Sequence, residues 1–125
     1  MHKIKLVFIA GPYRANTRFG TEKNIHIAET LAIEVAKLGA YPICPHANTR
    51  AYFEDLQDDE FWLQATRETL SRCDAIILVA GWRQSVGALA EYELAKRIGL
   101  PTFIHIRELK EWMEENEKVE NQIEA

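Results

Sequence analysis

Residues 75–106, AIILVAGWRQSVGALAEYELAKRIGLPTFIHI, decide the fold class of this chain. The run at 75–81 is apolar throughout, which is typical of a central parallel strand covered on both faces. Residues 87–99 follow with a helical pattern that ends at Gly99, and 101–106 form a further β-rich run. A strand, a helix and a strand in this order predict a parallel unit with a right-handed crossover.

The rest of the chain repeats this alternation. Strands are predicted at 5–11 and 41–44, and helices at 21–40, with Thr21 as its N-cap, and at 58–73. Residues 107–119 read as a polar C-terminal helix and 120–125 as a tail. We therefore expect one domain over residues 1–125, with its core in 4–106. The predicted class is α/β, a Rossmann-like (flavodoxin-like) three-layer sandwich with a parallel sheet of four to five strands and helices on both faces.

Composition limits the partners of the 125-residue chain. The formal net charge is −4, much of it from the acidic C-terminal segment, and no basic stripe suggests a nucleic acid polymer as a partner. The apolar run near the N-terminus is too short for a signal peptide or a membrane span, so we expect a cytoplasmic protein without a membrane partner. Cys44 and Cys73 lack CxxC spacing and favour buried, reduced thiols over a disulfide or a metal site.

Three loops follow the predicted strands and meet at one edge of the sheet, where ligands bind in folds of this kind. The first loop, GPYRAN (11–16), contains neither GxGxxG nor a P-loop motif, so no dinucleotide cofactor is expected. Gly11 allows close approach of the backbone. Tyr13 and Arg14 project from the strand end, and the arginine fork suits carboxylate or phosphate. A merely solvated arginine is the alternative.

The second loop, PHANTRAY (45–52), contains His46, Arg50 and Tyr52. No second histidine or carboxylate stands at metal-ligand spacing, which argues against a zinc site, and we expect no metal. A lone histidine most often forms hydrogen bonds within a loop. Arg50 and Tyr52 either line a pocket or pack on the following helix.

The third loop and its helix give the most specific signal. Ser85 and Gly87 lie at a helix N-terminus, where exposed amides and a hydroxyl favour an anion. Glu91 lies one turn into the helix and leans back toward this end, whereas Glu93 is about 200° further round and faces elsewhere. A serine hydrolase is disfavoured, because the motif is RQSVG rather than GxSxG and His105 falls within the predicted strand 101–106.

These segments together resemble the nucleoside 2-deoxyribosyltransferase superfamily, which includes deoxynucleoside 5′-monophosphate N-glycosidases. The similarity covers roughly residues 4–106 and rests on FIAGPYR (8–14), CDAIILVAGW (73–82) and SVGALAEYELAKRIGLP (85–101). PICPHANTRAY (42–52) looks most like a small phage and bacterial branch of that superfamily. No known role in that branch can be assigned to His46. We treat His46 as a candidate substrate-binding residue.

The resemblance implies specific roles. Glu91 falls on the family's catalytic glutamate, and Ser85 and Gly87 fall on residues that handle the nucleotide. Tyr13 and Arg14 match a loop that holds sugar and phosphate, and Tyr13 is counted with the catalytic residues. Tyr13 and Trp82 are aromatic groups suited to stacking on sugar or base, with packing at the sheet rim as the alternative for Trp82.

The expected function is cleavage or transfer at the N-glycosidic bond of a nucleoside or nucleoside 5′-monophosphate. A carboxylate suits this chemistry because it stabilises an oxocarbenium-like transition state or forms a covalent intermediate. The choice between a hydrolase and a transferase stays open. A nucleotide-binding or sensing module without turnover is the alternative function. Metal-dependent hydrolysis is a third, disfavoured alternative. A homo-oligomer, a dimer or larger, is expected.

Overall fold

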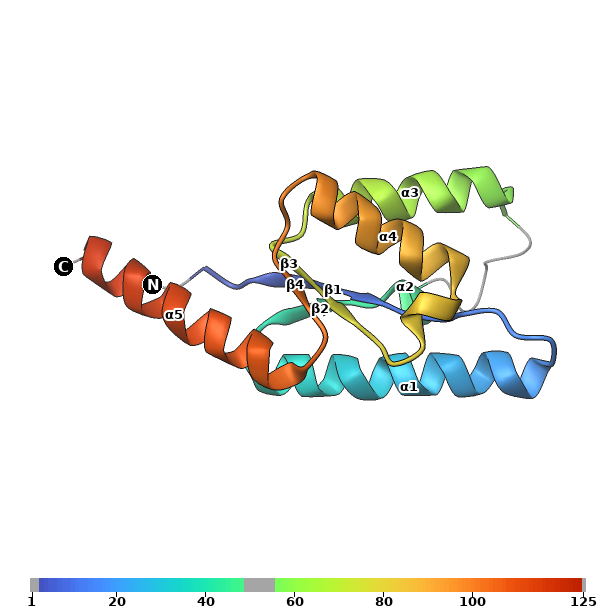
Figure 1. Ribbon diagram of the computed structural model, residues 1–125, viewed down its shortest axis with the longest axis horizontal. Helices are drawn as coiled ribbons and strands as arrows, with labels where there is room; N and C mark the ends of the chain where they lie inside the picture. The colour runs from blue at the N-terminus through green and yellow to red at the C-terminus, as the bar shows by residue number, and fades with distance from the viewer. Residues whose placement is uncertain (1–2, 49–55, 125) are drawn as a thin grey trace.

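The computed structural model describes residues 3–48 and 56–124 of the chain. In chain order its elements are β1 (Leu6–Ala10), α1 (Arg18–Lys37), β2 (Tyr41–Ile43), α2 (Pro45–Asn48), α3 (Asp59–Ser71), β3 (Ala75–Leu78), the short 3-10 helix η1 (Trp82–Gln84), α4 (Val86–Arg97), β4 (Thr102–Phe103) and α5 (Ile106–Glu124). The described strands form one parallel sheet in the order β2-β1-β3-β4 (Figure 1). No helix in this part of the chain is long and apolar enough to cross a membrane.

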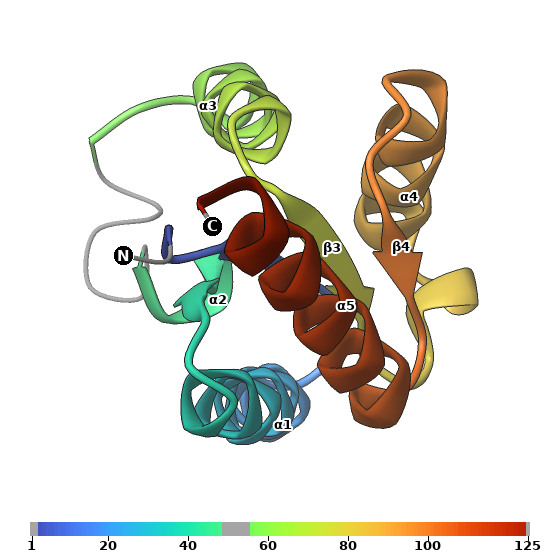
Figure 2. The same cartoon turned by 90° about the vertical axis from the view of Figure 1, so that its left-hand side faces the viewer.

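Helices cover both faces of the sheet (Figures 1 and 2). Successive side chains of a strand point to opposite faces, so each central strand feeds two cores. Val7 and Ile9 of β1 pack with α1 and α5, and Phe8 and Ala10 pack with α3 and α4. The predicted three-layer α/β sandwich of Rossmann-like type is thereby confirmed, with four strands in the described residues.

Two helices in the first half differ from the prediction. Helix α1 begins at Arg18, not Thr21, because the Thr17 side chain accepts a hydrogen bond from the Gly20 amide at 3.0 Å. The Thr21 hydroxyl instead accepts from the Ala15 amide at 3.0 Å and fixes the preceding loop. The predicted loop after β2 contains the short helix α2. Side-chain caps thus moved the start of α1 earlier than periodicity indicated.

The C-terminal third also differs. Strand β4 spans only Thr102–Phe103, so His105 lies outside it, and its amide donates to the Glu108 side chain at the start of α5. Helix α5 continues to Glu124, through the residues predicted as a tail. A salt bridge of 3.1 Å between Lys5 and Glu120 ties its second half to the beginning of the first strand.

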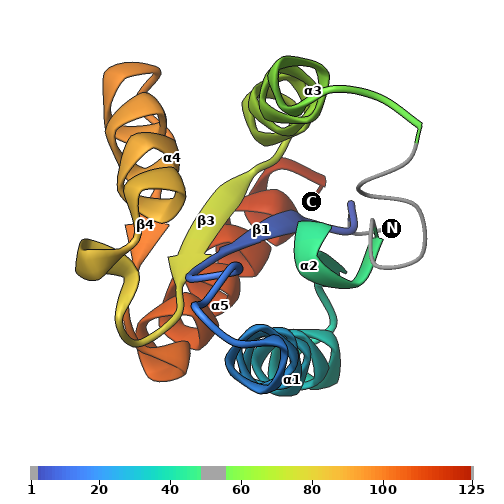
Figure 3. The ribbon, with the colours of Figure 1, turned by 90° about the vertical axis from the view of Figure 1, so that its right-hand side faces the viewer.

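The order of the strands locates the crevice of the fold. Strand β1 has β2 on one side and β3 on the other, so the crossovers run in opposite directions from it. Figure 3 shows β1 beside β3, with β4 beyond β3. In open parallel sheets this switch point leaves a crevice outside the carboxyl ends of the strands. The segments after β1 and β3 therefore border the expected binding position.

Gly11 permits the close approach of these two segments. An added Cβ at Gly11 would lie 2.5 Å from Cβ of Val79, which is itself buried and donates its amide to the Ala10 carbonyl. We predict that Gly11→Ala lowers the free energy of unfolding by about 1–3 kcal/mol, because the methyl group overpacks against the buried Val79 side chain. Urea denaturation measures this change. Gly87→Ala is the matched control, since a Cβ there meets no atom within 4 Å; equal midpoints for the two variants would contradict the prediction.

Candidate active site

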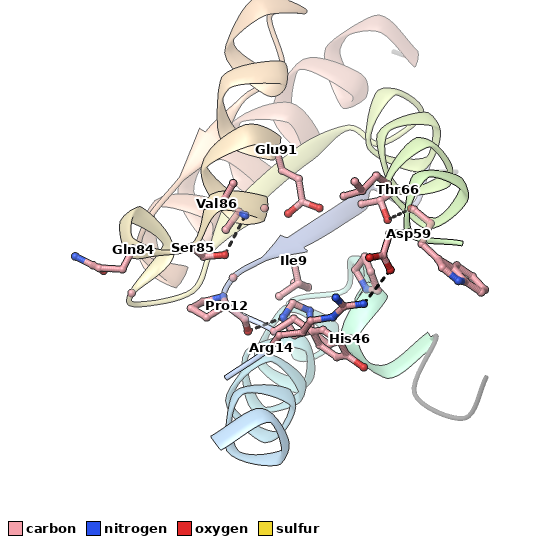
Figure 4. A pocket seen from close by; sticks show the side chains of 18 residues that line it. Ile9, Pro12, Arg14, His46, Asp59, Thr66, Gln84, Ser85, Val86 and Glu91 are labelled. Carbon is pink, nitrogen blue, oxygen red and sulfur yellow. Dashed lines mark hydrogen bonds and ion pairs between the residues drawn. The ribbon is translucent and has the colours of Figure 1, made fainter. Parts of the chain in front are cut away.

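A cavity of about 490 Å³ lies at the carboxyl ends of the strands (Figure 4). Its lining comes from β1 and the segment after it, from α2 and α3, and from α4 and the segment that joins β3 to α4. Of the sites predicted from sequence, those that line it are Gly11, Tyr13, Arg14, His46, Ser85, Gly87 and Glu91. Loops that are distant in sequence therefore converge as the topology predicted. Arg50 and Tyr52 lie outside the described residues.

The carboxyl group of Glu91 points into this cavity from α4 (Figure 4). The side chain is half-buried, and no described residue forms a hydrogen bond or ion pair with it. Burial alone raises the pKa of Glu91 to about 8. Glu93, two residues further on, is exposed. The helical period thus separates the two glutamates as the sequence indicated, and Glu91 is neutral for most of the time at pH 7.

The pKa of Glu91 links folding to pH. Folding favours the neutral carboxyl group, so this contribution is fully present below pH 4.5 and is lost as the pH rises through about 8. We predict that Glu91→Gln unfolds at nearly the wild-type midpoint at pH 5 and is more stable by about 1–3 kcal/mol at pH 9. Urea denaturation at both pH values measures the difference. Glu93→Gln is the control, and a Glu91→Gln difference that does not grow with pH would refute the prediction.

The start of α4 forms the anion-favouring end of the cavity. The Ser85 hydroxyl oxygen caps the helix by accepting from the Ala88 amide at 3.2 Å. The amides of Val86 and Gly87 belong to the first turn, whose N–H groups have no partner within the helix. Gly87 is exposed and leaves open space in front of this turn. A phosphate or carboxylate group suits such a position.

Arg14 brings a cation to the same cavity, where it is paired. Its Nη2 donates to Oδ1 of Asp59 at 3.1 Å, and both side chains are largely exposed (Figure 4). Asp59 follows the N-cap Asp58 in the first turn of α3. Asp59 was not among the site residues predicted from the sequence. The predicted topology could have pointed to Asp59, because the N-terminal turn of α3 faces the same edge of the sheet as the loop after β1.

His46 holds the turn after β1. The histidine is 6% exposed, and its Nε2 lies 2.8 Å from the Pro12 carbonyl oxygen. Because a carbonyl only accepts, Nε2 carries the proton, and burial lowers the pKa of His46 and keeps the ring neutral. The ring also packs edge-on against Tyr13, with centroids 5.4 Å apart. His46 thus positions the turn that carries Tyr13, a contact that sequence spacing could not reveal.

Trp82 is placed away from the cavity. Its ring is buried against Tyr92 of α4, with centroids 4.6 Å apart, and the Arg83 guanidinium lies 4.9 Å from the ring centroid. Trp82 is not among the described residues that line the cavity, so the packing alternative describes its position. The aromatic wall is formed instead by Trp62 of α3. Trp62 was not among the site residues predicted from the sequence.

Helix α3 supplies the wall opposite α4. Trp62, Leu63 and Thr66 line the cavity, and Leu63 is 47% exposed. The Thr66 hydroxyl donates to the Trp62 carbonyl at 2.8 Å, which leaves its oxygen as an acceptor. Apolar residues of α3 that do not face the core, such as Leu63, were the signal that could have identified this wall.

The two cysteines are not among the described residues that line the cavity. Cys44 and Cys73 are free thiols, and burial raises the pKa of Cys73 to about 11. Within residues 3–48 and 56–124, no group of three histidine, cysteine, aspartate or glutamate side chains is placed to hold a metal ion.

A family model matches residues 5–105, which include every described residue that borders the cavity. The family is described as a domain of unknown function, DUF7768. No curated protein matches the chain. The matched region ends just before α5 and covers most of the chain, so the protein belongs to the DUF7768 family.

Proposed function

We propose that the protein cleaves or transfers at the N-glycosidic bond of a nucleoside 5′-monophosphate or nucleoside, with Glu91 as the nucleophile. The observation that carries this proposal is the half-buried Glu91 carboxyl group, which shares one cavity with the open first turn of α4. The resemblance of residues 8–14, 73–82 and 85–101 to the nucleoside 2-deoxyribosyltransferase superfamily supports it.

The geometry of α4 suits a substrate with a phosphate at one end and a reactive carbon at the other. The Cα atoms of Ser85 and Glu91 are six residues apart, roughly 9 Å along the helix axis. Side chains of a helix lean toward its N-terminus, which brings the carboxyl group closer to the first turn. A sugar that places its 5′-phosphate on the amides of Val86 and Gly87 then directs C1′ toward Glu91.

The reaction proceeds in two steps. The bond from C1′ to the base nitrogen breaks, the base leaves with the electron pair and, where it is a neutral base, takes up a proton from solvent, and a Glu91 carboxylate oxygen bonds to C1′. Water, or the nitrogen of a second base, then attacks C1′ and releases Glu91. The Arg14 fork adds a charged contact to the phosphate by exchanging its exposed partner Asp59 for the ligand.

One observation favours a second candidate, a binding module without turnover. The Glu91 carboxyl group is mostly neutral at pH 7, and a neutral carboxyl group donates a hydrogen bond rather than attacking carbon. Such a module binds nucleotides and releases no base.

A product assay decides between the two candidates. The purified chain is incubated at pH 8 with the common nucleosides and deoxynucleosides and their 5′-monophosphates, with and without a free acceptor base, and the products are separated by chromatography. Free base identifies a hydrolase, and a new nucleoside or nucleotide carrying the acceptor base identifies a transferase. Binding by calorimetry without any product would support the module and end the catalytic proposal.

A further inference from the structure

The surroundings of Glu91 bear on which leaving group the cavity accepts, a question that rests on the proposed function. The cavity that holds this carboxyl group has apolar lining from Ile9 of β1, Ala88 of α4 and Leu63 of α3. No described residue offers Glu91 a cation or a hydrogen-bond donor, and Arg14 is paired with Asp59. An ionised carboxylate in such surroundings lacks the compensation that water or a cation gives it.

A positive charge on the ligand supplies that compensation. A cationic ring next to Glu91 favours the ionised carboxylate, which is the form that attacks C1′. The cavity also has aromatic lining in Trp62 and Tyr13, and aromatic faces attract planar cations. A cavity with this lining therefore suits a flat, positively charged heterocycle.

The departure of the base gives a second, chemical argument. A neutral base needs a proton as it leaves. A base bound to the sugar through a positively charged ring nitrogen does not, because the electron pair of the broken bond neutralises that nitrogen. Of the described histidine and aspartate side chains of the cavity, His46 donates its proton to the Pro12 carbonyl and Asp59 accepts from Arg14, so neither is placed to protonate a leaving base. A Glu91 that attacks C1′ has itself no proton to give.

We propose that the preferred substrates are 5′-phosphorylated N-glycosides whose leaving base is cationic, such as a pyridinium ring. The bond from C1′ to the positive nitrogen breaks, the nitrogen keeps the electron pair, and the base leaves neutral. Glu91 bonds to C1′. Water then attacks C1′, the bond to Glu91 breaks with its electrons returning to the carboxylate, and the proton of the water passes to solvent.

Nicotinamide mononucleotide and AMP test this inference, because they share the ribose 5′-phosphate and differ in the charge of the base. Base release is measured from pH 6 to pH 9. We expect kcat/KM at pH 7 to be at least about 100-fold higher for nicotinamide mononucleotide. We also expect kcat for this substrate to stay flat with pH, because the bound cation keeps Glu91 ionised, while kcat/KM rises toward pH 8. The flat kcat is the decisive readout, since the greater lability of a pyridinium glycoside raises rates without changing their pH dependence.

The outcomes separate this inference from the proposed function. Release of neutral bases at equal or higher kcat/KM, or a kcat for nicotinamide mononucleotide that rises through pH 8, overturns the preference for a cationic base and leaves the glycosidase proposal standing. No base from either compound, nor from the neutral deoxynucleotides and nucleosides, overturns both. Glu93→Gln serves as the matched control and keeps the wild-type preference, because its side chain is exposed.

Discussion

Glu91→Gln is expected to lower kcat for base release by at least about 10³-fold. Glutamine has nearly the same shape as glutamate, so it keeps the cavity but cannot form an ester with C1′ or carry the negative charge that stabilises an oxocarbenium ion. The measurement is the initial rate of base release at pH 8, where about half of the wild-type Glu91 is ionised.

The neighbouring glutamate provides the control for this loss. Glu93 is on the same helix and in the same sequence context but is exposed, so Glu93→Gln should stay within about twofold of the wild type. Because Glu91→Gln is expected to be the more stable protein at alkaline pH, its loss of rate cannot be attributed to unfolding. Equal rates for the Glu91→Gln variant and the wild type would remove Glu91 from the mechanism.

The pH dependence of base release is the second large effect. The free protein must ionise Glu91 before it attacks C1′, and burial raises the pKa of this group to about 8. For a neutral nucleotide we therefore expect kcat/KM to rise about tenfold per pH unit below 7 and to level off above 8, roughly 100-fold between pH 6 and pH 9. Steady-state kinetics in buffers of constant ionic strength measure the profile.

The direction of this profile identifies the active form of Glu91. A rise toward alkaline pH requires the carboxylate and supports a nucleophile. A profile that falls through pH 8 would instead require the neutral carboxyl group, and Glu91 would then act as a proton donor. That result would contradict the assigned role while keeping Glu91 in the site.

Much of this arrangement was predictable because it depends on local periodicity and on topology. Apolar runs separated by helical patterns give a parallel sheet, and the carboxyl ends of its strands bring together the loops that carry Tyr13, His46 and Ser85. The separation of Glu91 from Glu93 follows from the helical period alone. These inferences need no knowledge of distant contacts.

The remaining features depend on contacts between segments that are far apart in sequence. The ion pair of Arg14 with Asp59 joins residues 45 positions apart, and the hydrogen bond from His46 to Pro12 joins residues 34 apart. The position of Trp82 was open for a similar reason, since a rim tryptophan either lines a pocket or packs on a helix. Its contact with Tyr92 decides between the two. Side-chain caps such as Thr17 likewise set helix boundaries that sequence propensity does not define.

The central claim is that Glu91 breaks the N-glycosidic bond of a bound nucleotide. The most direct measurement compares wild type and Glu91→Gln side by side at pH 8, with free base separated by chromatography after incubation with the 5′-monophosphates, nicotinamide mononucleotide included. The account predicts base from the wild type and none above background from Glu91→Gln. Base from neither protein, or base from both at the same rate, would contradict it.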